Sequence, residues 1–258
     1  MRMDINCDMG EGFGAYNMGD DEKIMGFVTS VNIACGWHAG DPVVMARTVR
    51  LAAQYGVAVG AHPGYPDLLG FGRRTMETFP GEVKNYVLYQ VGALCGFLRE
   101  HKMRLQHVKP HGALYNVAAR DERTAGEVIS AVKAYDPELI LVAPAGSLCA
   151  EMAVSEGLRV VGEAFADRAY LADGQLAPRA MEGAVIHDPD AVRERVLSLA
   201  TSGRLPAMEG GQIELEAGTL CIHGDTPGAW RLARTVRQAL EEAGVEVAPM
   251  GTGNTTGN

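Results

Sequence analysis

The chain has 258 residues, of which 47% are hydrophobic and 21% are charged. This composition excludes intrinsic disorder for most of the chain, because disordered segments combine high charge with low apolar content. The formal net charge of −9 argues against a nucleic-acid partner, since gripping a phosphate backbone needs a basic surface. We therefore expect a globular protein, built as two small domains or as one α/β barrel.

The five cysteines disfavour a disulfide framework and a thiolate zinc site, because their number is odd and none forms a CxxC pair. Reduced, buried thiols in a cytoplasmic protein are the expected state. No apolar run is long enough to cross a membrane, and the first residues read as a strand rather than a signal peptide. We expect no membrane partner.

Short apolar runs alternate with helical patterns along the chain. Seven runs bounded by Gly, Pro, Asp or Asn predict strands at 3–7, 31–35, 57–61, 106–108, 139–143, 159–165 and 219–222. Helical spacing of apolar residues predicts helices at 42–55, 80–102 and 229–243, the first with Asp41 as its N-cap. Seven strand–helix units with apolar strands favour a closed parallel barrel over an open sheet.

We expect one barrel domain over residues 1–250 and a flexible tail at 251–258, which contains only Gly, Thr and Asn. The region 181–212 fits the alternation less well, and it is expected to hold an inserted segment and a helix near 191–201.

Polar residues follow nearly every predicted strand. In a parallel barrel all strands end on one face, so these residues should converge at one mouth. The candidates are Asp8 and Glu11 after the first strand, His38 and Asp41 after the second, His62, Asp67, Arg73 and Arg74 after the third, Lys109, His111 and Asn116 after the fourth, and His223 and Asp225 after the last. The sixth strand ends in a further polar cluster that is expected at the same mouth and has no assigned role, namely Glu163, Asp167, Arg168 and Tyr170. Walker, dinucleotide-binding and serine-elbow motifs are absent from the sequence.

These clusters closely resemble the LamB/YcsF family. The matching stretches are residues 4–14, 32–42, 60–67, 70–74, 108–116, 163–170 and 222–225. The resemblance implies an irregular seven-stranded, TIM-like (β/α) barrel, similar to polysaccharide deacetylases. It also implies a role in the ATP-dependent opening of 5-oxo-L-proline to L-glutamate, with ATP as co-substrate and with partner subunits B and C. Trp37 stands where Phe is more usual in the family, and its larger ring is expected to narrow the mouth.

The implied reaction assigns roles to the candidates as hypotheses. Asp8 and Glu11 are acid/base candidates, because two carboxylates after one strand can reach a common point. Lys109 and His111 would contact phosphate or polarise the lactam carbonyl. A guanidinium fork of Arg73 or Arg74 would hold the substrate carboxylate. The remaining candidates complete or support substrate binding: His38, Asp41, His62, Asp67, Asn116, His223 and Asp225.

Two other functions remain open. A divalent metal held by Asp8 and two of the four strand-end histidines (His38, His62, His111, His223) would make the protein a metal-dependent deacetylase or amidohydrolase on a small or carbohydrate substrate. Alternatively, the chain is a non-catalytic substrate-binding subunit, and its partners carry the chemistry.

Overall fold

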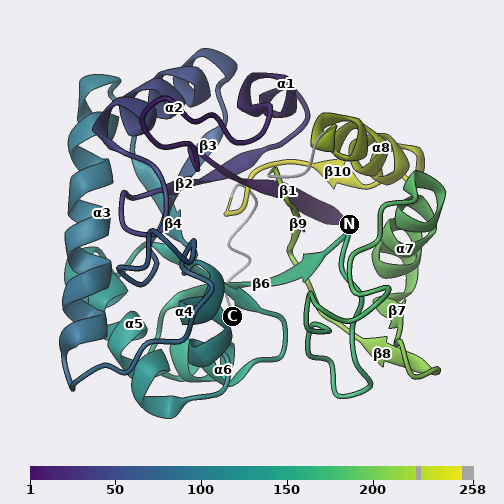
Figure 1. Ribbon diagram of the computed structural model, residues 1–258. Coiled ribbons are helices and arrows are strands. Elements are labelled where there is room, and N and C mark those ends of the chain that lie inside the picture. The colour runs from purple at the N-terminus through teal and green to yellow at the C-terminus, as the bar shows by residue number, and fades with distance from the viewer. Residues whose placement is uncertain (225–227, 252–258) are drawn as a thin grey trace.

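Seven parallel strands form a closed barrel at the centre of the molecule (Figure 1). The computed structural model describes residues 1–224 and 228–251. The barrel strands, in their order around it, are β1 (Arg2–Met9), β2 (Ser30–Ala34), β3 (Ala58–His62), β4 (Leu105–Val108), β5 (Ile140–Pro144), β6 (Arg159–Phe165) and β9 (Thr219–Ile222). β9 pairs with β1 as well as with β6, which closes the barrel. β10 (Glu246–Val247) pairs in parallel with the amino-terminal end of β1.

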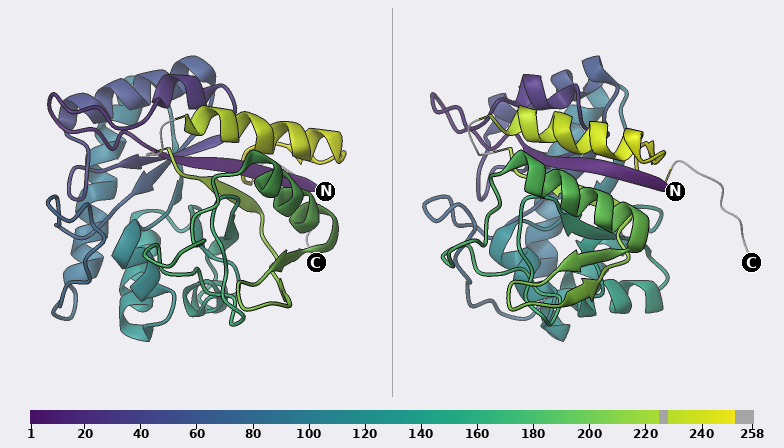
Figure 2. Two further views of the ribbon diagram at one scale, coloured as in Figure 1. Left: turned by 45° about the vertical axis from the view of Figure 1, so that its right-hand side comes forward. Right: turned by 90° about the vertical axis from the view of Figure 1, so that its right-hand side faces the viewer.

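Helices cover the outside of the barrel (Figures 1 and 2). They are α1 (Asp21–Met25), α2 (Pro42–Tyr55), α3 (Glu82–Glu100), α4 (Gly112–Ala118), α5 (Glu122–Tyr135), α6 (Leu148–Ser155), α7 (Pro189–Ser202) and α8 (Ala229–Glu242). No helix of the described residues is both long and apolar enough to span a membrane.

The predicted elements agree closely with the structure. Each of the seven predicted strands corresponds to a barrel strand, and the three predicted helices correspond to α2, α3 and α8. The irregular region holds α7 and an antiparallel hairpin of β7 (Arg204–Pro206) and β8 (Gln212–Glu214). The prediction of an α/β barrel is therefore confirmed; most of the predicted tail, 252–258, lies outside the described residues.

The ends of α2 show how local sequence sets the elements. The Asp41 side chain accepts hydrogen bonds from the amides of Val43 and Val44, and Pro42 occupies the first turn. Gly56 ends the helix in the left-handed conformation, with φ of 65°. Asp41 thus serves as the predicted N-cap.

Side chains of β1 alternate between two environments. Met3, Ile5 and Cys7 are buried in the main apolar core. Asn6, from the other face of the strand, crosses the barrel to Thr219 of β9 at 2.7 Å and to Glu163 of β6 at 2.9 Å. The barrel interior is therefore polar along β1, whereas ordinary TIM barrels fill it with layers of Val, Ile and Leu.

Candidate active site

The carboxyl ends of the strands surround a cavity of about 810 Å³. Many of the predicted site residues line it, although they lie far apart in the chain. They are Asp8, Glu11, His62, Arg73, Lys109, His111, Asn116 and His223. The common direction of the strands brings their ends to one face, as expected for a barrel.

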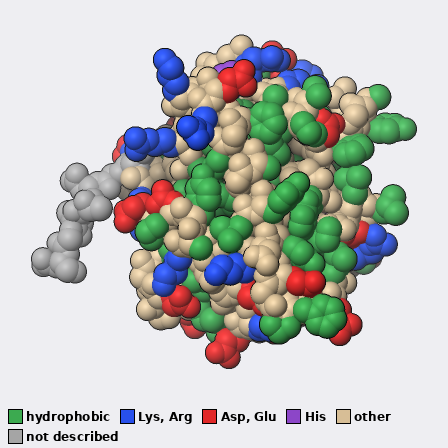
Figure 3. All heavy atoms as spheres, turned by 90° about the vertical axis from the view of Figure 1, so that its left-hand side faces the viewer, with side chains coloured by type: hydrophobic (Ala, Val, Ile, Leu, Met, Phe, Trp, Pro, Cys, Tyr) green, Lys and Arg blue, Asp and Glu red, His purple; other side chains and the backbone are tan. Residues whose placement is uncertain are grey.

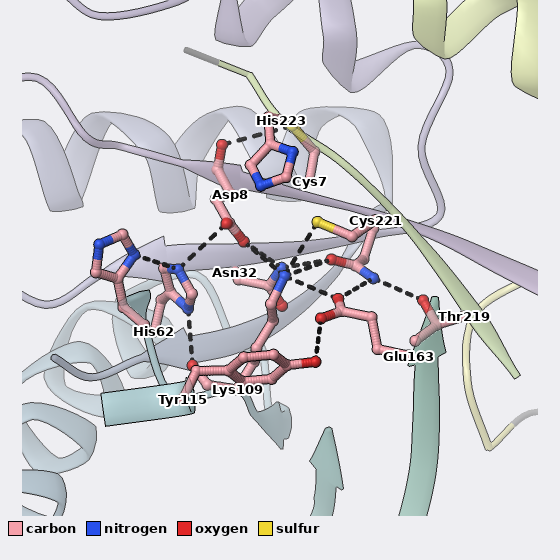
Figure 4. Close-up of polar contacts among 12 residues, drawn as sticks. Cys7, Asp8, Asn32, His62, Lys109, Tyr115, Glu163, Thr219, Cys221 and His223 are labelled. Carbon is pink, nitrogen blue, oxygen red and sulfur yellow. Dashed lines mark hydrogen bonds and ion pairs between the residues drawn. The ribbon is translucent and has the colours of Figure 1, made fainter. Parts of the chain in front are cut away.

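Asp8, near the end of β1, lies between a histidine and a lysine (Figure 4). Its Oδ2 is 3.3 Å from His62 Nε2, and its Oδ1 accepts a hydrogen bond from Lys109 Nζ at 3.1 Å. Asn32 Nδ2 donates to the same Oδ1 at 2.8 Å. Burial alone would raise the pKa of Asp8, but His62 and Lys109 hold it well below its usual range. Asp8 therefore faces the cavity as a carboxylate.

Lys109 is a buried cation held between two carboxylates (Figure 4). Its Nζ lies 2.8 Å from Glu163 Oε1 and 3.1 Å from Asp8 Oδ1. The Tyr115 hydroxyl donates to the other oxygen of Glu163 at 2.6 Å. Burial disfavours the charge on Lys109, yet Asp8 and Glu163 help to keep its pKa well above the usual value. This buried charge is stable because it is paired and hydrogen-bonded.

Two backbone carbonyls determine which ring nitrogens of His62 and His111 carry hydrogen. His62 Nδ1 donates to the Lys109 carbonyl at 2.7 Å, and His111 Nε2 donates to the Phe71 carbonyl at 2.8 Å. The other two nitrogens, His62 Nε2 and His111 Nδ1, face each other at 2.9 Å. Burial lowers the pKa of His111 to about 3, so this ring is neutral. Two facing ring nitrogens can approach this closely only if they share a proton or both bind a metal ion.

Glu11 and His38 extend this pair into a group of four possible metal ligands. One ligand atom from each of Glu11, His38, His62 and His111 lies within 4.8 Å of the others. The His38 ring stacks on His111 with a centroid distance of 3.7 Å, and both its nitrogens are buried without a hydrogen-bond partner among the described residues. Burial and the neighbouring His111 hold the pKa of His38 well below its usual range, which leaves it in the neutral form that binds metals.

Two glycines let the loop after β3 cover these histidines. A Cβ on Gly72 would lie 2.7 Å from His38 Cβ and 2.8 Å from His111 Cδ2, and its φ of +63° also favours glycine. A Cβ on Gly64 would lie 2.8 Å from His38 Nδ1. The loop can approach the rings this closely only without side chains at these positions.

His223, after β9, forms a dyad with a carboxylate that follows β6. Its Nδ1 lies 3.0 Å from each carboxylate oxygen of the buried Asp167, and its ring stacks on Phe165 at 5.5 Å. Burial would raise the pKa of Asp167, but His223 lowers it below the usual value. The ionised Asp167 therefore orients the imidazole, which lines the cavity.

Other predicted residues occupy different places. Asp41 caps α2, and Asp67 pairs with Arg74; none of these three side chains lines the cavity. Asp67 accepts from the amide of Gly70 at 3.0 Å, so the pair shapes the loop around the site. Asp225 lies outside the described residues.

The expected effect of Trp37 on the mouth is wrong. Its ring packs on the outside against Tyr86 and Tyr89 of α3, with centroid distances of 4.9 and 5.4 Å. It is not among the residues that line the cavity. Figure 3 shows this side of the molecule, where hydrophobic side chains gather on the surface.

Several residues to which the sequence assigned no role also belong to the site. Glu163, Tyr115 and Arg168 line the cavity, and Asp167 supports His223. Glu163, Asp167 and Arg168 stand in the polar cluster expected at the mouth after the sixth strand, and Glu163 shares a face of β6 with Phe165. The partners of these side chains come from other strands, which strand patterns alone do not pair.

Comparison with known proteins covers nearly the whole chain. The A subunit of 5-oxoprolinase from Syntrophobacter fumaroxidans is 66% identical over 251 residues, which covers 97% of this chain and 99% of that protein. The crystal structure of a lactam utilization protein from Thermus thermophilus has a TM-score of 0.91 and 52% identity, and the match covers 96% of this chain and 99% of that one.

A more distant match concerns the fold alone. A family 4 carbohydrate esterase from Streptomyces lividans has a TM-score of 0.50 at 13% identity, covering 97% of this chain and 93% of that chain. The model of the LamB/YcsF family, by contrast, matches residues 3–255. The chain therefore belongs to the LamB/YcsF family.

Proposed function

We propose that this chain is the A subunit of an ATP-dependent 5-oxoprolinase, which opens 5-oxo-L-proline to L-glutamate as ATP is hydrolysed. The enzyme is a cytoplasmic complex with partner subunits B and C. Support comes from the relatives that are named as the A subunit of 5-oxoprolinase, which match this chain over nearly its full length. All five cysteines are free thiols, which fits a reducing compartment.

The observation that carries the proposal is the meeting of Asp8, Lys109 and the His223–Asp167 dyad at one cavity. A lactam is a poor electrophile with a poor leaving group, so opening it needs an activated carbonyl, a base and an acid. ATP supplies the activation by phosphorylating the lactam oxygen, with release of ADP. Attack by water and departure of the ring nitrogen then leave an acyl phosphate, which a second water hydrolyses to L-glutamate and phosphate. Asp8, with Glu11 near it, accepts the proton of the attacking water. His223, held by Asp167, protonates the departing nitrogen, and Lys109 offsets negative charge near Asp8.

The surface supports a role within a complex. On the α3 side, Tyr89 is 64% exposed and Phe79, just before α3, is 77% exposed. Hydrophobic side chains are numerous on this side of the molecule (Figure 3). Exposed apolar surface of this kind is typical of protein–protein contacts.

Reconstitution tests the proposal. The chain is mixed with its partner subunits, and glutamate release and ATP hydrolysis are followed together. We expect turnover only when the partners and ATP are present. His223→Ala, which removes the proposed acid, should abolish it with little change in melting temperature, and His101→Ala at the end of α3 is the matched control.

Each other outcome has a clear meaning. Lactam opening by the chain alone, without ATP, contradicts the coupling. Full turnover in the complex with His223→Ala would favour a non-catalytic binding role instead.

A second candidate, a metal-dependent deacetylase or amidohydrolase, is favoured by one observation. Ring nitrogens of His62 and His111 converge beside Glu11 and beside His38, whose nitrogens form no hydrogen bond among the described residues. These four residues, rather than a set centred on Asp8, would hold a divalent metal, because three imidazoles and a carboxylate suit zinc and similar ions. A bound metal would supply activation of water and polarisation of a carbonyl.

Cobalt binding tests the metal site directly, because Co²⁺ ligand bands in the visible spectrum report coordination without an activity assay. We expect one Co²⁺ per chain, and His38→Ala should lose the bands while His101→Ala keeps them. Equal Co²⁺ spectra in wild type and His38→Ala would contradict a metal site at these residues. Deacetylation activity that is lost after chelation would favour the second candidate.

A further inference from the structure

Arg168, in the loop after β6, is a buried cation without a carboxylate of its own. It is 6% exposed and lines the cavity. Its guanidinium donates to the backbone carbonyls of Ala184 and Ala177, which carry no net charge. The preceding carboxylate, Asp167, directs both of its oxygens to His223. Asp167 favours the charge of Arg168 without forming an ion pair with it among the described residues. A buried charge whose hydrogen bonds all go to neutral acceptors is costly unless a counter-ion arrives.

Further arginines line the same cavity as Arg168. Arg120 and Arg179 also line the cavity, and both are exposed at its rim. Neither forms an ion pair within residues 1–224 and 228–251. Burial lowers the pKa of Arg168 and the charge of Arg179 lowers it further, whereas the charge of Asp167 raises it.

Four of the acidic side chains that line the cavity already accept hydrogen bonds or form ion pairs. Glu214 accepts from Arg204 at 2.5 and 3.0 Å, and Asp173 accepts from Gln175 at 3.0 Å. The carboxylates of Asp8 and Glu163 are bound to Lys109. Five acidic and five basic side chains thus line the cavity, but Arg120, Arg168 and Arg179 form no ion pair with those carboxylates within residues 1–224 and 228–251.

We propose that Arg168 and Arg179 form an anion subsite that holds the carboxylate of the lactam substrate. Both guanidinium groups line one cavity, and each offers paired N–H donors that match the two oxygens of a carboxylate. No hydrogen bond or ion pair joins either arginine to Asp8 or to the three clustered histidines within the described parts of the chain. The subsite thus binds the end of the molecule that does not react, while the lactam carbonyl points toward Asp8. Naming the lactam rests on the proposed function.

Calorimetry on the full chain tests the subsite without turnover. The probes are 5-oxoproline, its uncharged carboxamide, acetate and inorganic phosphate. We expect the wild type to prefer 5-oxoproline over the carboxamide by about tenfold or more, because charged hydrogen bonds are strong. Arg179→Gln should lose this preference with the carboxamide affinity unchanged. Arg193→Gln is the matched control, because Arg193 of α7 pairs with Glu242 of α8 and does not line the cavity.

The outcomes separate the subsite from the proposed function. Lactam binding that ignores Arg179→Gln overturns the subsite and leaves the function standing. Acetate binding that depends on Arg179, without any lactam binding, supports the subsite and counts against the function. If Arg179→Gln loses phosphate binding but keeps the preference for 5-oxoproline over its carboxamide, the two arginines bind a phosphoryl group and the proposal is overturned. Absence of all binding also overturns it.

Arg168→Lys provides a second variant, because it keeps the charge but loses the planar fork. We expect it to weaken 5-oxoproline binding about tenfold while the melting curve shows a folded protein. Unchanged affinity in this folded variant contradicts a role for Arg168.

Discussion

The two ends of the barrel interior have similar polar residues but differ in how these residues are satisfied. At the amino end, the Asp4 carboxylate accepts hydrogen bonds from Thr29, Ser30 and Thr219. At the carboxyl end, neither ring nitrogen of His38 has a hydrogen-bond partner within the described residues, and nitrogens of His62 and His111 face each other. One end is a closed network, and the other is open toward a cavity.

The difference shows that a buried polar group does not by itself mark a site. Asp4 is as buried as His62, at 1% exposure each. What distinguishes the carboxyl end is unused hydrogen-bonding capacity beside space for a ligand, and such unpaired groups are rare in native interiors. The amino end stabilises the fold, and the carboxyl end is the part available for chemistry.

The largest expected effect comes from Asp8→Asn at the open end. The amide keeps the shape and can still accept from Lys109, but it cannot take a proton. We expect kcat of the reconstituted complex to fall about a thousandfold, within the range for loss of an acid/base group. Denaturant unfolding should give a midpoint close to that of the wild type. A variant that is inactive only because it unfolds would break the contrast between the two ends.

Asp4→Asn tests the closed end through pH. Burial raises the pKa of Asp4 from 3.8 to about 6. The folded state therefore favours the protonated carboxyl of Asp4. The stability that this form contributes is complete below the unfolded pKa and is lost as the pH rises through about 6. Asparagine resembles the protonated acid at every pH. Relative to wild type, the variant should gain about 3 kcal/mol of unfolding free energy between about pH 4 and pH 7, measured by urea titration.

Turnover provides the control for that variant, because Asp4 lies away from the cavity. We expect the complex with Asp4→Asn to retain its activity. A stability difference that does not change with pH would show that Asp4 is ionised without cost.

A smaller effect is expected for Asp167→Asn, which changes a residue that positions His223. The amide can no longer accept from Nδ1 at both oxygens, so the imidazole loses its preferred orientation. We expect kcat to fall about a hundredfold with KM little changed. The ¹⁵N shifts of His223 should report the altered tautomer, and unaltered shifts would contradict the positioning role.

Much of the fold could be predicted from local sequence. Runs of apolar residues between turn residues located the seven strands, and Asp41 with Pro42 marked the start of α2, because strand alternation and helix capping are local properties. Polar residues after the strands indicated the mouth of the barrel, because parallel strands all end on one face. The long connection from β6 to β9 was predicted only in outline, since its hairpin depends on packing rather than on period.

The amino-acid sequence by itself determined the strand–helix alternation, the face on which the polar residues gather and the family. Only the tertiary structure decided which of these residues touch. It turned Asp41 into a helix cap, paired Asp67 with Arg74, and joined Glu163 to Lys109 and Asp167 to His223. The reason is that a strand end sets direction and depth, whereas pairing depends on the closure of the barrel and on the side chains from other strands that meet inside it.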